Sequence, residues 1–417
     1  MLLCMRKRSS INKIIKLNRV GSKQTMSDSQ YRRVEADIDL DAIRYNIETV
    51  QKLNSPEKKT LLVIKADAYG HGAVALAREF NDLADYYAVA TVEEAVELRQ
   101  NNIEKPILIL GYTDESEYEV VIENDITTAM YDYERAEILS DMALDKGKKA
   151  KVHIKVDSGM SRIGFQCDDE GVDEALRLTE LPGLEIEGIF THYAKADYKD
   201  KSDAMIQYGK FTWFVKKLES EGVEFKLRHI DNSAGAMEIH SNGFDMMRLG
   251  IVIYGLYPSE EIDKRIVLKP AMSLKARVIH VKELPAGRGI GYGWTYITDR
   301  PTKVATVSVG YADGYPRALS GKGRVLIHGE YAPILGRVCM DQIMVDVTDI
   351  DEAGDEVVVG DEVILFGNQG DNSISVEEVA EPANSFNYEE VCNISRRVPR
   401  VYHKDGKEVY TVDYLMK

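Results

Sequence analysis

The 417-residue sequence has no long apolar run, few cysteines and too few basic residues to balance its acidic ones. No stretch approaches the roughly 20 apolar residues that a membrane-spanning helix needs. The four cysteines lie far apart, which argues against a cysteine metal site and favours a reducing compartment. The net charge of −16 argues against nucleic acid and anionic membranes, because both attract basic patches. We therefore expect a cytoplasmic protein with no nucleic-acid, membrane or metal partner.

The first 25 residues lack acidic side chains, although they carry seven lysines and arginines. This composition is typical of an organelle transit peptide, and the segment has no apolar core of a secretory signal. A disordered tail or an upstream start codon is an equal alternative, because Met26 restarts the chain shortly before the first expected strand. We treat residues 1–33 as a leader or disordered segment and exclude them from the fold.

Short apolar runs alternate with helical patterns over the first part of the chain. A first strand is expected at 34–39. Eight further strands are expected at 61–65, 86–90, 106–110, 127–130, 151–157, 184–190, 225–231 and 246–249. Repeated strand–helix units favour a parallel α/β sheet, and eight of them favour a closed (β/α)8 TIM-like barrel over an open doubly wound sheet. We place this barrel at residues 34–266.

Helical periodicity fades after Val267, and short alternating runs separated by turn residues replace it. Further strands are expected at 276–281, 302–309, 323–327, 343–347 and 362–366. This change predicts a second, mainly β domain at residues 267–417.

One lysine, Lys65, stands at the end of the apolar run 61–64 and is followed by Ala-Asp-Ala-Tyr-Gly-His-Gly. A lysine at a buried strand end is costly unless it has a role there, although its stem can also carry the charge out to solvent. Burial favours the free amine that Schiff-base chemistry requires, and the glycines let the backbone approach a ligand. Active sites of such barrels lie at the carboxyl ends of the strands. We interpret Lys65 as a residue that binds a carbonyl cofactor.

The strand expected at 151–157 also carries unusual polar residues. Its alternation places His153, Lys155 and Asp157 on one face. Three ionisable groups on the interior face of a barrel are unfavourable unless they interact with one another. The loop that follows presents Arg162, whose guanidinium suits bidentate binding of a carboxylate. A surface arginine is an equal alternative on these residues alone.

Polar residues combine with glycine at further expected strand ends and turns. His192 follows one strand, and Ser233 lies where another leads into a helix whose free amides suit a phosphate. A structural histidine and an ordinary helix cap are the alternatives. Arg248 closes the last strand next to Gly250, and Tyr292 stands in the turn Gly-Ile-Gly-Tyr-Gly.

Together these stretches resemble the motifs of the alanine racemases, pyridoxal 5′-phosphate enzymes with a (β/α)8 barrel and a β domain. The resemblance recurs in order from about residue 34 to residue 402. It implies that Lys65 binds pyridoxal phosphate and that L-alanine is racemised to D-alanine through an external aldimine. Racemisation needs a proton-transfer group on each face of the α-carbon. The resemblance assigns these roles to Lys65 for the D-enantiomer and Tyr292 for the L-enantiomer.

The resemblance also implies the residues that hold the cofactor and the substrate. Those expected at the cofactor are Lys65, Tyr69, His192, Ser233, Arg248, Gly250 and Ile251. His192 is expected to stack on the pyridine ring and Arg248 to face its nitrogen, which an arginine leaves unprotonated, so that transamination is disfavoured. Arg162 and the backbone amide of Met340 are expected to hold the substrate carboxylate.

Supporting roles and the assembly follow from the same resemblance. A lysine matching Lys155 is often carbamylated in the family and orients the arginine that matches Arg162. Tyr311 and Asp341 are expected along the access route to the site. The family forms head-to-tail homodimers in which the β domain of one subunit reaches the barrel of the other, and its usual role is D-alanine supply for the cell wall.

One position departs from the family pattern. Arg396 stands where an aromatic residue usually precedes the Arg-Val-Pro-Arg run. A guanidinium still binds phosphate, but it cannot support Tyr292 by ring packing. We therefore expect a roomier or more polar substrate pocket and measurable activity on serine as well as alanine.

Two other classes of protein share part of the pattern. Barrel decarboxylases of basic amino acids carry a lysine on the barrel but do not need Tyr292. Cofactor-carrying homeostasis proteins are barrels without a β domain, which the 150 residues after Val267 argue against.

Overall fold

The computed structural model describes residues 31–239 and 243–416, and residues 33–417 form one unit by their contacts. The expected leader at 1–33 lies almost wholly outside the described residues. Among the described helices, none combines the length and the apolar character that crossing a membrane requires.

Eight parallel strands form the expected barrel and are paired in the order β10-β2-β3-β4-β5-β6-β8-β9. They are β2 (Lys59–Val63), β3 (Tyr86–Val89), β4 (Ile107–Ile109), β5 (Thr127–Met130), β6 (Ala150–Asp157), β8 (Leu184–Phe190), β9 (Leu227–His229) and β10 (Met246–Leu249). The amides of Asp245 and Arg248 donate to the carbonyls of Arg228 (2.8 Å) and Asp231 (3.1 Å), which brings the two end strands together. The barrel is therefore nearly closed, and the expected fold is confirmed.

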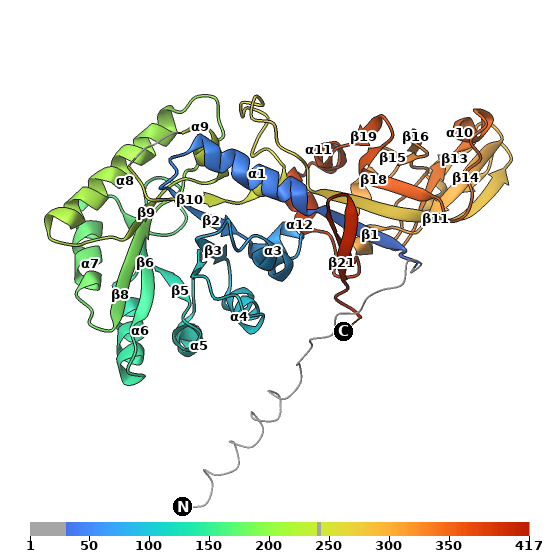
Figure 1. Ribbon diagram of the computed structural model, residues 1–417. Helices are drawn as coiled ribbons and strands as arrows, with labels where there is room; N and C mark the ends of the chain where they lie inside the picture. Colours follow the sequence, from blue (N-terminus) through green and yellow to red (C-terminus); the bar gives the residue numbers. More distant parts are fainter. Residues whose placement is uncertain (1–30, 240–242, 417) are drawn as a thin grey trace, which may run out of the picture. The chain divides into compact units, whose positions relative to one another are not determined.

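Helices lie on the outside of these strands, as Figure 1 shows for the green helices beside β6 and β8. They are α1 (Leu40–Leu53), α3 (Ala73–Glu79), α4 (Val92–Gln100), α5 (Tyr118–Glu123), α6 (Tyr133–Asp145), α7 (Asp169–Thr179), α8 (Ser202–Ser220) and α9 (Ser233–Glu238). Helix α1 begins where Asp39 accepts from the Ala42 amide (2.9 Å), and it buries Ile43, Ile47 and Val50. Helical periodicity and local capping thus account for its start and its inner face.

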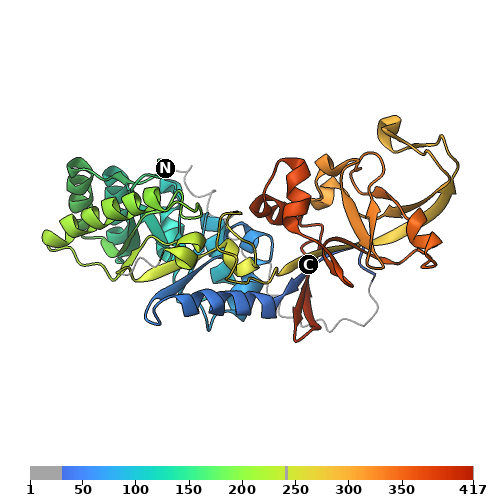
Figure 2. The same ribbon diagram turned by 90° about the horizontal axis from the view of Figure 1, so that it is seen from above.

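The second sheet includes the strand expected first in the chain. Strand β1 (Val34–Asp39) pairs antiparallel with β11 (Met272–Leu284) and parallel with β20 (Arg400–Lys404). The sheet runs in the order β16-β15-β18-β11-β1-β20-β21, and β14, β17 and β19 branch from it. Figure 2 shows blue β1 running between the yellow and red strands. The first strand of the chain therefore belongs to the sheet that the last residues complete.

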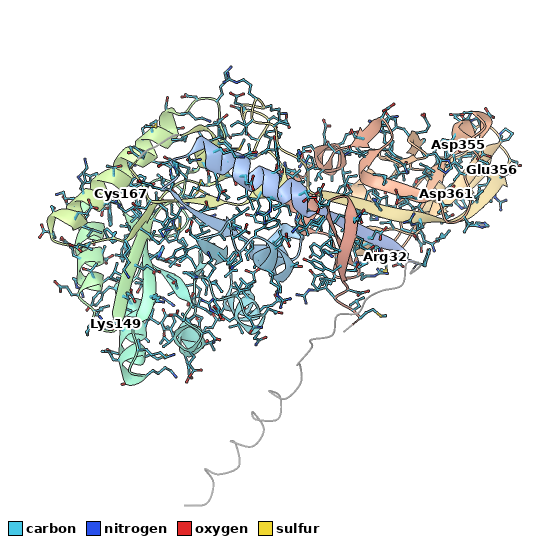
Figure 3. The ribbon with its side chains drawn as sticks, viewed as in Figure 1. Arg32, Lys149, Cys167, Asp355, Glu356 and Asp361 are labelled. Carbon is cyan, nitrogen blue, oxygen red and sulfur yellow. The ribbon has the colours of Figure 1, made fainter. Side chains whose placement is uncertain are left out.

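The remaining elements of this part follow the expected change to short strands. They are β12 (Gly289–Ile290), β13 (Tyr296–Ile297), β14 (Thr302–Val307), β15 (Arg324–Ile327), β16 (Glu330–Pro333), β17 (Ile343–Asp346), β18 (Glu362–Gln369), β19 (Asn372–Ile374), β21 (Lys407–Val412), α10 (Thr348–Glu352), α11 (Val376–Ala380) and α12 (Asn387–Cys392). Figure 3 labels Asp355, Glu356 and Asp361 on the connection between α10 and β18. A mainly β second part is confirmed.

Candidate functional site

Lys65 lies at the carboxyl end of β2 and starts a short turn, α2 (Lys65–Tyr69), whose backbone is left-handed. Ala66, Asp67, Ala68 and Tyr69 all have φ between 51° and 54°. This region costs a non-glycine residue roughly 1–2 kcal/mol. Four such residues in a row form a strained turn that persists only where its surroundings hold it.

Helix α4 supplies one support for this turn. The Glu94 carboxylate accepts from the Ala66 amide (2.6 Å) and the Ala90 amide (2.7 Å). It also completes a capping box with Thr91. The same carboxylate therefore fixes the start of α4 and the backbone next to Lys65.

The C-terminal segment supplies the other supports, which we call the C-terminal clamp (Arg400, Tyr402 and Tyr414). Arg400 is buried and donates to the carbonyl of Gly70 (2.8 Å) as well as to three carbonyls of its own segment. Tyr402 donates to the carbonyl of His71 (2.9 Å), and the Tyr414 hydroxyl donates to the Asp67 carboxylate. The turn that carries the lysine is thus held by residues more than 300 positions later.

Two glycines of the turn make room for this segment. A Cβ at Gly70 would lie 2.2 Å from the Val391 carbonyl oxygen, and one at Gly72 would lie 1.9 Å from the Tyr402 hydroxyl. Both glycines have positive φ (81° and 96°). Their role therefore differs from the expected one, because they admit the protein's own chain here and not a ligand.

Cationic side chains gather at the carboxyl ends of the strands. Burial and then Arg162 lower the pKa of Lys65. Lys155 donates to the Val156 carbonyl (2.7 Å) and lies 5.3 Å from the Phe190 ring. Burial and then Arg248 lower the pKa of Lys155 to about 7. This concentration of positive charge suits an anionic cofactor and a carboxylate substrate.

The loop after β6 presents Arg162 as the sequence predicted. The Asp157 carboxylate accepts from the amides of Gly159 (2.9 Å), Ser161 (3.0 Å) and Arg162 (2.9 Å). Burial is the largest single influence and raises the pKa of Asp157, but these bonds and the charge of Lys155 together hold the pKa below its usual value. The exposed Arg162 side chain is thereby carried on a loop that one carboxylate organises.

Arg248 is buried on β10 and has a defined set of acceptors. Its Nη2 donates to the carbonyls of Thr191 (2.8 Å) and Ile230 (2.9 Å) and to Nδ1 of His192 (3.1 Å). Burial and then Arg248 hold the pKa of His192 well below its usual value. His192 is therefore neutral, and the lone pair of its Nδ1 accepts the hydrogen bond from Arg248.

A cup of hydroxyls and amides forms where β9 and β10 end. Ser233 Oγ accepts from the amides of Gly250 (3.0 Å) and Val252 (3.5 Å). A Cβ at Gly250 would lie 3.0 Å from the Tyr69 hydroxyl. Ile251 follows directly and begins a 3-10 turn (Ile251–Tyr254). Tyr69, Ser233, Gly250 and Ile251 thus converge, and hydroxyl and amide groups of this kind suit a phosphate.

The cap of α9 differs from the alternative considered for Ser233. Asn232 caps the helix, since its side chain accepts from the Gly235 amide (2.9 Å). Ser233 is therefore not the N-cap, and its hydroxyl faces the amides of the cup.

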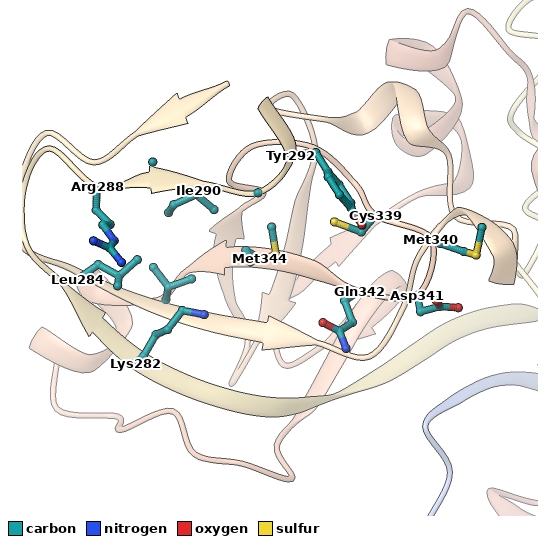
Figure 4. Close-up of a pocket in the computed structure, with 13 residues that line it drawn as sticks. Lys282, Leu284, Arg288, Ile290, Tyr292, Cys339, Met340, Asp341, Gln342 and Met344 are labelled. Atoms are coloured by element: carbon teal, nitrogen blue, oxygen red, sulfur yellow. The ribbon is translucent and has the colours of Figure 1, made fainter. Parts of the chain in front are cut away.

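The predicted residues of the β domain lie apart from this group. Tyr292, Met340 and Asp341 line a groove of about 790 Å³, and Figure 4 shows the Tyr292 phenol beside Cys339. Tyr292 is 70% exposed and Met340 52%. The neighbours that shift the pKa of Lys65 are Arg162, Cys392 and Glu94, and Tyr292 is not among them.

The remaining predicted residue of this part, Tyr311, lies near the same groove. Tyr311 is partly exposed, and its amide donates to the carbonyl of Cys339 (3.1 Å), which lines the groove. Asp341 pairs with Arg397 (2.8 Å). The candidates therefore fall into two groups, one at the barrel end and one in the β domain.

Sequence reasoning missed several residues at the barrel end. The Tyr388 ring lies 6.1 Å from the Tyr69 ring, and Cys392 is close enough to Lys65 to affect its pKa. Burial raises the pKa of Cys392 to about 11, which keeps it a thiol. Arg396 lies 5.7 Å above the Tyr414 ring. The Arg-Val-Pro-Arg run was the available signal, since it directs attention to the segment that contacts the lysine turn.

At one end, the parallel barrel carries a lysine, a cup of hydroxyl and amide groups, and buried cations, and a β domain follows it. This combination is that of the lysine-dependent barrel enzymes. Residues 38–258 match the N-terminal domain of alanine racemase, and residues 271–402 match its C-terminal domain. The chain belongs to the alanine racemase family.

Individual relatives agree over nearly the whole chain. The chain is 46% identical over 386 residues to the alanine racemase of Clostridium perfringens, covering 92% of this chain and 99% of that one. It is 45% identical over 369 residues to the alanine racemase of Methanococcus maripaludis, covering 88% and 98%. Among solved structures, the alanine racemase of Clostridium difficile superposes with a TM-score of 0.88 at 42% identity, covering 93% and 100%.

A second solved structure contains a ligand. The alanine racemase of Bacillus anthracis with bound L-Ala-P superposes with a TM-score of 0.87 at 38% identity, covering 93% of this chain and 99% of that one. The match therefore extends over the barrel and the β domain together.

Proposed function

We propose that the protein is a pyridoxal-phosphate-dependent alanine racemase that interconverts L-alanine and D-alanine. The observation that carries this proposal is Lys65 at the end of β2, beside the phosphate cup and Arg248, in a chain that matches alanine racemases over both domains. A decarboxylase or a homeostasis barrel would not account for the match of residues 271–402.

The barrel end fits the cofactor by the chemistry of its donors. Tyr69, Ser233, Gly250 and Ile251 would hold the phosphate, and Lys65 would bind the carbonyl carbon. His192 would lie against the ring, and Arg248 would face the ring nitrogen. The bound cofactor supplies an electron sink for the α-carbanion of the substrate.

Arg248 limits the chemistry that this site favours. A guanidinium offers only N–H donors, so it cannot accept a hydrogen bond from a protonated ring nitrogen and would leave the nitrogen that it faces unprotonated. The electron sink is then weaker than one backed by a carboxylate, and a carbanion at the substrate needs rapid reprotonation. This favours racemisation over transamination.

Two groups on opposite faces of the α-carbon would move the proton. Burial and Arg162 lower the pKa of Lys65, which increases the fraction of free amine near neutral pH. Tyr292 would be the opposing group, and Arg162 with the Met340 amide would hold the substrate carboxylate. Lys155 would orient Arg162, as a carbamate where it is modified, and Tyr311 and Asp341 would line the access route.

A head-to-tail homodimer would bring the two groups of residues together. Tyr292, Trp294 and Ile297 are 70%, 73% and 60% exposed around the turn at 292–294. Large apolar side chains clustered on a surface are typical of an interface. The barrel end of a second copy would cover this surface and supply Lys65 to the site.

The remaining assignments belong to the same proposal. The cofactor-binding domain expected at residues 34–266 would exclude strand β1, which pairs with β11 and β20 in the second sheet, and residues 267–417 would supply the second base. The protein would act in the cytoplasm, where family members supply D-alanine for the cell wall.

Chiral chromatography tests the proposed activity. Protein loaded with pyridoxal phosphate is incubated separately with L-alanine, L-serine and L-lysine. We expect D-alanine as the main product and a smaller amount of D-serine, because Arg396 replaces an aromatic residue. A preference for alanine of about 100-fold or more in kcat/KM would contradict the serine expectation, since it corresponds to about 2.7 kcal/mol of discrimination.

The variant Tyr292→Phe tests the second base. Losing the phenolic proton acceptor should reduce the conversion of L-alanine about 100-fold or more, the contribution typical of general acid–base catalysis. Tyr296→Phe, two residues after the turn at 292–294, is the control. Equal activity of both variants would refute the role of Tyr292 and favour a decarboxylase-like use of Lys65.

A further inference from the structure

Two histidines connect Arg248 to a carboxylate deep inside the barrel. Nη1 of Arg248 lies 2.9 Å from Nδ1 of His229, and Nε2 of His229 lies 2.8 Å from Nδ1 of His153. Nε2 of His153 faces the Glu187 carboxylate at 3.5 Å. These four residues lie on β10, β9, β6 and β8, so the chain of contacts crosses the barrel interior.

The far end of this chain lies away from the site. Glu187 accepts from the Thr127 hydroxyl at 3.5 Å, and Thr127 is the first residue of β5. Tyr86, the first residue of β3, also lies close to the Glu187 carboxylate. The carboxylate is therefore anchored among strand starts, opposite to the strand ends that carry Lys65.

The burial of both histidines fixes their protonation. Neither ring is exposed, and burial lowers the pKa of His153 and holds that of His229 well below its usual value. A neutral imidazole has one N–H donor and one lone pair. The Phe190 ring stacks on His229 at 4.8 Å with an interplanar angle of 2°, which keeps that ring in one orientation.

Only one arrangement of protons satisfies the chain. Arg248 can only donate, so Nδ1 of His229 must accept and its Nε2 must carry the proton. That proton requires a lone pair on Nδ1 of His153, whose own proton is then on Nε2. The Glu187 carboxylate lies 3.5 Å from this nitrogen without a hydrogen bond in the structure, and its negative charge favours a proton there. The guanidinium and the carboxylate therefore select the same tautomers from opposite ends.

We propose that Glu187 is a positioning residue of the racemase, which acts through His153 and His229 to keep an acceptor on Nη1 of Arg248. The other terminal nitrogen of the guanidinium, Nη2, has its own acceptors in Thr191, Ile230 and His192. If Glu187 cannot accept, the histidines are free to exchange tautomers, and a protonated Nδ1 on His229 would oppose the arginine. The guanidinium would then lose its fixed position. The role of Arg248 at the cofactor rests on the proposed function, whereas the proton arrangement does not.

Nitrogen-15 NMR of histidine-labelled protein tests the arrangement directly. In the wild type, His153 and His229 should both show protonated Nε2 and unprotonated Nδ1. A coupling across the Nε2–H···Nδ1 hydrogen bond should link the two rings. Signals of the opposite tautomer in either ring would overturn the proposal without any variant being made.

Variants of Glu187 connect the arrangement to the reaction. Glu187→Leu removes the acceptor, so it should give mixed tautomers and lower kcat for alanine about tenfold or more, as expected for a lost bond to a charged group. KM should change much less than kcat. Glu187→Gln keeps an acceptor oxygen and should retain the tautomers and most activity.

Glu185→Leu is the matched control, because Glu185 lies on the same strand and pairs with Lys226 (2.6 Å). It should leave tautomers and kcat unchanged. Altered tautomers with unchanged kcat in Glu187→Leu would overturn the positioning role. An inactive wild type with the expected tautomers would instead refute the proposed function and leave the proposed proton arrangement intact.

Discussion

The ammonium of Lys155 lies inside the barrel, against the Phe190 ring and near two arginines, where a positive charge is unfavourable. The sequence predicted the linkage of ionisable groups on β6, because alternation places them on one face. It did not predict the partners, since His153 contacts His229 and Glu187 on other strands. Partners of this kind depend on strand order and register, which the local pattern does not contain.

Lys155→Met should stabilise the protein most at low pH. The pKa of Lys155 falls from 10.5 to about 7, so between these values the unfolded state binds more protons. Stability of the wild type therefore rises with pH across this window. The variant lacks this dependence, so its advantage should be largest near pH 6 and shrink toward pH 10.

Urea unfolding in bicarbonate-free buffer at pH 6, 8 and 10 measures this difference. Lys151→Met, on the same strand with its ammonium paired to Asp125 (2.8 Å), is the control. A difference between wild type and Lys155→Met that grows with pH would contradict the assigned pKa direction.

Local sequence patterns predicted the barrel strands but not the left-handed turn α2. The eight barrel strands follow from apolar runs bounded by turn residues, and the structure places all of them close to the expected positions. The left-handed backbone at 66–69 was not predictable, because alanine, aspartate and tyrosine rarely adopt it. Contacts remote in sequence impose it, and the C-terminal clamp provides several of them.

Tyr402→Phe should weaken cofactor binding. The change leaves the His71 carbonyl without its donor and loosens the turn that carries Lys65 and Tyr69. A lost hydrogen bond of this kind costs about 1–2 kcal/mol, which corresponds to a rise in Kd of about five- to thirtyfold. Titration of the apoprotein with pyridoxal phosphate, followed by fluorescence, measures the change.

Tyr410→Phe is the matched control for this variant. The Tyr410 ring stacks on the Tyr402 ring with 4.5 Å between their centroids, but Tyr410 is partly exposed on strand β21. The same Kd for both variants would show that the clamp does not position the turn.

In the whole molecule, the candidate residues of one chain fall into two separate groups. Lys65 and the cup of hydroxyls and amides lie at the barrel end, whereas Tyr292 and Met340 line an exposed groove of the β domain. Motif order predicted both groups from the sequence. The sequence could not predict that β1 joins the second sheet, since its pairing with β11 and β20 is decided by segments more than 200 residues away.

In the proposed head-to-tail dimer, each active site combines Lys65 of one subunit with Tyr292 of the other. Lys65→Ala and Tyr292→Phe are each expected to be almost inactive. In a mixed head-to-tail dimer, one site has lost both residues and the other retains both.

Mixing the two inactive variants after partial dissociation tests whether the two subunits share each site. Random reassociation gives half mixed dimers with one intact site of two, so activity should recover to about one quarter of the wild-type value. No recovery, with mixed dimers shown to form, would place both residues of a site on the same chain and rule out the shared site.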